Sequence, residues 1–159
     1  MRFIRSQKPD SAGHPFVFHI SKREKDVLLA TLKLYPLLDA SHHRLSRNPK
    51  TTGQAEQQWL EEAMEQQRQE HKKKLDQFFS NDRRFFRDCK VDFQLTLTGE
   101  QMEWLLRVLN EIRVGSWVRL GRPELEAAPR LKLTSEQTHF LASMELSGYF
   151  QSALLEAYN

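Results

Sequence analysis

Four polar residues in the second half of the chain have types and spacing suited to a binding site: Asn110, Glu111, Arg113 and Arg119. In a helix, Asn110 and Arg113 would share one face, because they stand three residues apart. An amide beside a guanidinium can bind a ligand or a partner. It can equally bond backbone carbonyls and carboxylates at a helix junction, which is the commoner role. The four residues are therefore a candidate binding or structural polar motif.

Catalytic and metal-binding patterns are not found in the sequence. The single cysteine, Cys89, has no base placed by spacing, and an ordinary thiol is the commoner case. His42 and His43 are adjacent, but no H-E-x-x-H or H-x-x-x-H occurs; His71 and His139, on predicted helices, suit surface or pH-sensing roles. Glycine-rich phosphate loops and the G-x-S-x-G motif are also missing. We expect no enzyme activity, no catalytic residue, no metal and no cofactor.

A basic segment with interleaved aromatic residues offers a second kind of chemistry. Its cations suit contacts to phosphates, and Phe85 or Phe86 suits stacking on a base. Alternatively, the two phenylalanines anchor the segment in the core and the charges are only solvated. No helix-turn-helix signature precedes the segment. The candidate nucleic-acid contacts are Lys72, Lys73, Lys74, Arg83, Arg84, Arg87 and Lys90.

Composition restricts the class of protein. The 159 residues are 39% hydrophobic and 28% charged, which is typical of one folded domain, here 1–159. One cysteine excludes a disulfide scaffold, and no apolar run suggests a membrane span or a signal peptide, so we expect a cytoplasmic protein. Net charge is +6 over 1–50, −4 over 51–67, +4 over 68–90 and −3 over 91–159. The overall +3 hides this division, which bears on the choice of partner.

A recurring pattern identifies where helices begin. The form L-x-L-T-x-E-Q-x-x-aromatic-L starts at Leu95 and again at Leu131, and a looser copy starts at Phe18. Each copy indicates a short strand that enters a helix through a capping box, in which the cap hydroxyl and the side chain three residues later satisfy early helical N–H groups. The expected pairs are Ser21 with Glu24, Thr98 with Gln101, and Thr134 with Gln137.

The elements that follow predict a helix-dominated α+β single domain with about four helices and a small antiparallel sheet. The sheet would hold an N-terminal hairpin plus one or two short strands. The predicted helices are 22–35, 53–79, 99–120 and 135–158. The predicted strands are 2–6, 15–20, 91–97 and, less clearly, 130–133. Residues 39–52 read as a flexible loop and residues 80–90 as a basic-aromatic connector.

The helix over 53–79 is long and mostly polar. Its thin predicted apolar stripe includes Trp59, Leu75 and Phe78. Such a helix is expected to lie across the surface or to pair with a partner chain. The helix over 99–120 is the expected centre of the core.

The segment 104–121 resembles a motif of a family of uncharacterised bacterial proteins. That family is best represented in actinobacteria, where it is encoded near the protease adaptor ClpS, and it includes AosR-like transcription regulators. Glu111 replaces the family's acid and Trp117 stands where the family has glycine. A redox-sensing role, which is attached to those regulators, needs paired cysteines, and this chain has only Cys89. The matching residues are Trp104, Leu105, Asn110, Arg113, Arg119, Leu120 and Gly121.

Two functional hypotheses follow. The first is a non-catalytic regulatory or adaptor domain that acts through a protein partner or through self-association. The alternative is a DNA-binding transcription regulator that uses the basic residues, and the family resemblance supports this alternative.

Overall fold

Three helices begin at the predicted capping boxes in the computed structural model, which describes residues 1–4, 15–38, 54–80, 85–87, 92–122 and 134–158. The helices are α1 (Lys22–Leu32), α3 (Gly99–Arg119) and α4 (Ser135–Leu155). At the start of α1 the Glu24 backbone N–H donates to the Ser21 hydroxyl, and the Ser21 N–H donates to the Glu24 carboxylate. The Thr98 and Thr134 boxes are also closed in both directions, so all three predictions are confirmed.

The strands form one antiparallel sheet in the order β1-β2-β4-β3. These strands are β1 (Arg2–Ile4), β2 (Phe16–Ser21), β4 (Asp92–Leu97) and β3 (Phe85–Arg87). Phe18 is paired with Phe3 on one side and with Leu95 on the other. The edge strand β3 was not predicted and lies inside the expected connector 80–90. The expected loop 39–52 and strand 130–133 lie outside the described residues.

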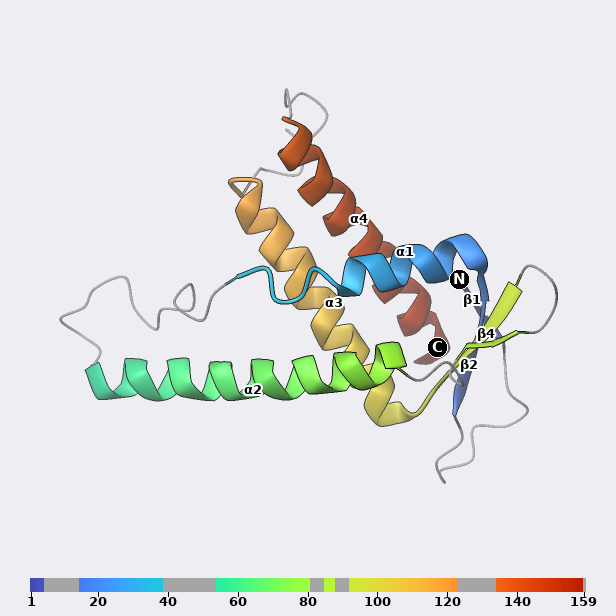
Figure 1. The fold of residues 1–159 in the computed structure, drawn as a ribbon, viewed down its shortest axis with the longest axis horizontal. Helices are drawn as coiled ribbons and strands as arrows, with labels where there is room; N and C mark the ends of the chain where they lie inside the picture. The colour runs from blue at the N-terminus through green and yellow to red at the C-terminus, as the bar shows by residue number, and fades with distance from the viewer. Residues whose placement is uncertain (5–14, 39–53, 81–84, 88–91, 123–133, 159) are drawn as a thin grey trace.

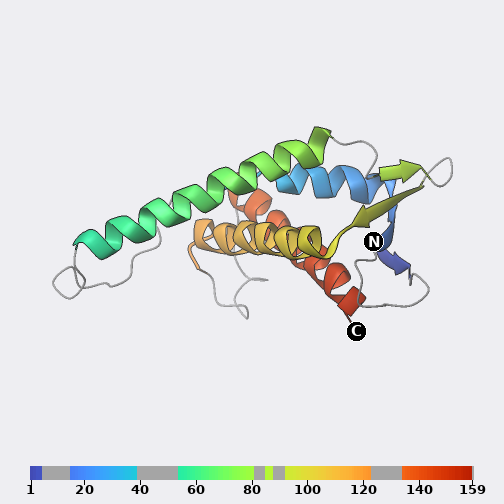
Figure 2. The same ribbon diagram turned by 90° about the horizontal axis from the view of Figure 1, so that it is seen from below.

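The helices form two layers around α3. Figure 1 shows α3 and α4 running antiparallel, with α1 crossing in front of them. In Figure 2, α1 and α2 (Gln54–Ser80) lie on one side of α3, and α4 crosses behind α3. The sheet closes one end of this assembly, and a short 3-10 turn, η4 (Glu156–Tyr158), follows α4.

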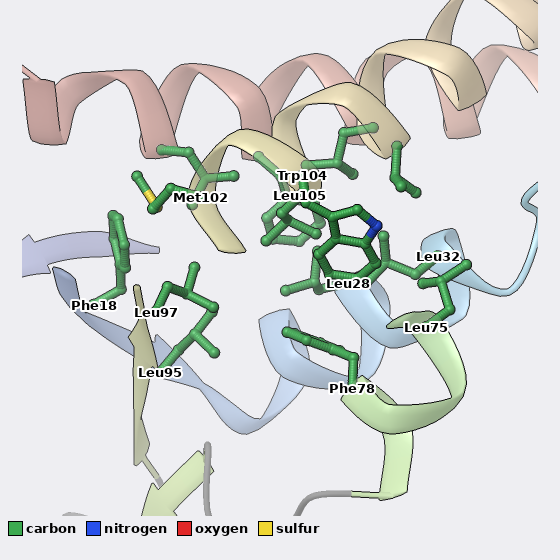
Figure 3. Close-up of a cluster of buried hydrophobic side chains, with 14 of the residues drawn as sticks. Phe18, Leu28, Leu32, Leu75, Phe78, Leu95, Leu97, Met102, Trp104 and Leu105 are labelled. Atoms are coloured by element: carbon green, nitrogen blue, oxygen red, sulfur yellow. The ribbon is translucent and has the colours of Figure 1, made fainter. Parts of the chain in front are cut away.

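The core lies where the sheet, α1, the end of α2 and α3 meet (Figure 3). Residues from elements far apart in sequence converge there because each element contributes one apolar face. The Trp104 ring packs against Phe78, with ring centroids 5.8 Å apart. Together these elements confirm a helix-dominated α+β domain. The fully buried side chains include Phe18, Leu28, Leu32, Phe78, Leu95, Leu97, Met102, Leu105, Leu109 and Ile112.

The predicted α2 stripe is wrong in the first half of the helix, where Trp59 and Ala63 are exposed. Leu75 and Phe78 are buried as expected, but Trp59 is 80% exposed. At 100° per residue, Trp59 lies roughly 160° around the helix from Leu75, so the two cannot share a face. Figures 1 and 2 both show the first half of α2 extending beyond α3. We call residues 54–67 the α2 arm.

Gly115 gives a test of the packing around α3. A Cβ added there would stand 2.8 Å from the Cβ of Leu37, which is too close without a backbone shift. We expect Gly115→Ala to lower the free energy of unfolding by about 1–3 kcal/mol, as overpacking typically does. Urea denaturation measures this effect.

The control is Gly148→Ala in α4, where an added Cβ meets nothing within 4 Å. Alanine favours a helix over glycine, so this variant should gain about 0.5–1 kcal/mol. Equal gains in both variants would contradict the close approach of Leu37 to α3.

Candidate interaction groove

The outward faces of α3 and α4 enclose a groove of about 900 Å³. It is lined from both helices and from the turn that follows α3. Its lining residues are Asn110, Arg113, Val114, Trp117, Arg122, Met144, Glu145, Gly148, Tyr149, Gln151, Ser152 and Leu155.

Much of the groove wall is apolar and open to solvent. Val114, Trp117, Tyr149 and Leu155 are between 39% and 50% exposed. Isolated surface apolar residues are ordinary, but several that gather around one groove are typical of a binding surface. Its volume exceeds those of the hollows beside Trp104, along the start of α1 and beside Pro36, which are about 210, 620 and 130 Å³.

Polar groups place positive charge along the same groove. The Arg113 guanidinium donates to Gln151 Oε1 (3.4 Å), and Gln151 Nε2 donates to the Leu106 carbonyl (3.3 Å), which links the two helices. Arg122 follows Gly121 in a left-handed turn, with φ values of 59° and 86°. The groove therefore has two guanidinium groups and one carboxylate, Glu145.

The structure separates the four residues of the sequence motif. Asn110 and Arg113 line the groove, as their spacing suggested. Glu111 lies roughly 200° around the helix from Arg113 and contacts α2 instead. Arg119 donates to the Leu37 carbonyl (3.3 Å), which is the structural role. Asn110 and Arg113 are thus brought together, whereas Glu111 and Arg119 are not part of the groove.

Sequence reasoning missed most of the groove. On α3, its residues follow helical spacing from Asn110 through Arg113 and Val114 to Trp117, a signal that was available. The helix over 99–120 is the expected centre of the core, but Trp117 within it is 39% exposed. The groove residues on α4, among them Tyr149 and Leu155, could not be predicted, because their place in the groove depends on how α4 packs on α3.

A polar cluster lies on the opposite side of α3. The Tyr35 hydroxyl is 3.1 Å from His71 Nδ1, and that nitrogen is 3.7 Å from Glu111 Oε1. Burial lowers the pKa of His71, although Glu111 acts in the opposite direction. Burial, and next the negative charge of Glu111, raise the pKa of Tyr35. The buried Arg68 side chain has an Nε without a hydrogen-bond partner. The cluster joins α2 to α3.

The basic candidates are spread over α2 and β3. Lys72 and Lys73 are exposed, and Lys74 Nζ pairs with Glu100 at 3.0 Å. Phe85 is buried, with Lys25 Nζ 4.6 Å from its ring centre, so it belongs to the core. Arg87 is in β3, whereas Arg83, Arg84 and Lys90 lie outside the described residues. Contact with nucleic acid stays a prediction.

Within the described part of the chain, no group of three or more His, Cys, Asp or Glu side chains is arranged to hold a metal ion. Cys89, His42 and His43 lie outside that part. No described helix is both long enough and apolar enough to cross a membrane.

The lowered pKa of His71 predicts a pH effect on stability. The unfolded chain takes up a proton near the ordinary value of 6.5, while the folded chain resists it, so the free energy of unfolding should fall as the pH drops through 6.5. His71→Gln should reduce this fall. Denaturant titrations at about pH 7.5 and about pH 5.5 measure it.

The matched control is His139→Gln, because His139 is exposed on α4. This control should keep the pH dependence of the original chain. If the His71→Gln variant also keeps the full pH dependence, the burial of a neutral His71 does not cause the loss of stability at low pH.

The chain was compared with protein families, curated proteins and solved structures. No family model matches the chain, and no curated protein or solved structure matches it significantly.

Proposed function

We propose that this chain is a non-catalytic adaptor or regulatory domain that acts through protein–protein contacts or self-association at the α3–α4 groove. The observation that carries the proposal is the gathering of half-exposed apolar side chains beside two arginines in one groove. Aromatic residues and arginine are the types that contribute most to protein interfaces.

The shape and chemistry of the groove favour a helical partner. Its two walls are neighbouring antiparallel helices, and a third helix can lay one face between them. Trp117, Val114 and Leu155 offer apolar contact, and Arg113 and Arg122 offer charge to carboxylates. A matching segment therefore carries an apolar anchor flanked by acidic residues.

DNA binding has less support from the described residues. Of the two aromatic rings considered for stacking on a base, Phe85 is buried, and the Phe86 side chain lies outside the described part of the structure. Lys74 is paired with Glu100. The resemblance of segment 104–121 to a bacterial family that includes regulators is compatible with a regulatory role through a protein partner, without DNA contact.

Charge placed in the groove tests the proposal. Leu155→Lys and Val114→Lys put an ammonium group among the apolar side chains that line it. Val114 is 43% exposed and Leu155 is 50% exposed, so the melting temperature should change little. Self-association, or binding of a protein captured from a source lysate, should weaken about 30-fold or more. Analytical ultracentrifugation and pull-down assays measure the two outcomes.

Ala142→Lys is the control, because Ala142 is exposed on α4 and does not line the groove. It should leave binding unchanged. Equal binding by the groove variants and the control would show that the groove is not the interaction surface.

A further inference from the structure

We propose that the occupant of the α3–α4 groove is the α2 arm of a second copy of this chain. This inference rests on the proposed function of the groove and names its partner. The juxtaposition that carries it is an exposed acidic helix with one tryptophan on one side of the molecule, and an apolar groove with two arginines on the other.

The α2 arm presents a face suited to docking. Trp59 is 80% exposed, which is a larger exposed fraction than that of any other large apolar side chain in the described part of the chain. Glu56, Glu62 and Ala63 stand three or four residues from Trp59, so they share its face. A tryptophan surrounded by small or polar residues is typical of an interface anchor.

Charge complementarity selects the groove as the surface that the arm fits. Residues 54–67 contain four glutamates and no lysine or arginine. The groove supplies Arg113 and Arg122, with Glu145 as the one acid in its lining. Trp59 would pack against Trp117, Val114 and Leu155 while Glu56 and Glu62 meet the arginines.

The α2 arm cannot reach the groove of its own chain. The second half of α2 is fixed to α3 by the contact of His71 with Glu111, on the face opposite Arg113. Trp59 precedes His71 by twelve residues, which is about 18 Å along a helix, and Figure 2 shows this length directed away from the body. A groove on another molecule is therefore required.

If the arm of each copy docks into the groove of the other, the assembly stops at two copies. Each copy has one arm and one groove, so two copies related by a two-fold axis satisfy both arms and both grooves. The complex would be a reciprocal dimer.

A charge-reversal exchange tests the pairing. Variant A, Glu56→Lys with Glu62→Lys, makes the face of the arm that carries Trp59 basic, and variant B, Arg113→Glu with Arg122→Glu, makes the groove acidic. In each variant alone, arm and groove carry like charges, and the dimer should weaken about 30-fold or more. When A and B are mixed, every arm meets a groove of opposite charge, and dimer formation should return. Sedimentation equilibrium of the full chain over a range of concentrations measures each case.

Two further variants identify the contact. Trp59→Ala should weaken the dimer but leave the melting temperature unchanged at concentrations where the chain is monomeric, because Trp59 is 80% exposed. Glu65→Lys changes the charge as much as either single substitution of variant A, but on a different side of the arm, and should leave the dimer intact.

Other outcomes overturn the inference in distinguishable ways. A chain that stays monomeric at all concentrations excludes the dimer but leaves the groove open to a different protein, which the lysate capture tests. A dimer unaffected by variant A excludes the arm as occupant. A dimer lost in both variants but not restored by mixing excludes the proposed pairing of arm and groove.

Discussion

The packing of α3 on two sides is the constraint on which the other elements depend. Its eight buried positions, from Met102 to Ser116, pack in the core that the sheet, α1, α2 and α4 also build. Each fully buried large apolar side chain contributes about 1.5–3 kcal/mol. Toward its end, the small residue Gly115 lets Leu37 approach the helix backbone. Because these faces are taken, only the face that carries Asn110 and Arg113 remains open, and it becomes one wall of the groove.

Features set by neighbours in sequence were predictable, and those set by distant contacts were not. The capping boxes at Ser21, Thr98 and Thr134 need only residues three apart, so the helix starts were found. The three residues of β3 form a strand because β4 lies beside them. The bond between Tyr35 and His71 also depends on tertiary packing, and polar residues carry no periodic signal of burial.

Only part of the candidate site could be predicted from the sequence, for a related reason. Consecutive helical residues diverge by 100°, so Asn110 and Glu111 serve different surfaces although they are neighbours in sequence. A motif read as one cluster thus divides into a groove residue and a residue that fixes α2. Trp59 was misplaced because a stripe followed over a long helix drifts away from the face where it began.

The pairing of β2 with β4 makes α2 an insertion between two neighbouring strands. The entropy of closing such an excursion grows only with the logarithm of its length, about 0.6 kcal/mol per doubling. The projecting end of α2 can therefore gain or lose helical turns in the course of evolution at little cost to the remainder of the domain. Each turn changes its span by about 5.4 Å, so the reach of the molecule is adjustable separately from its stability.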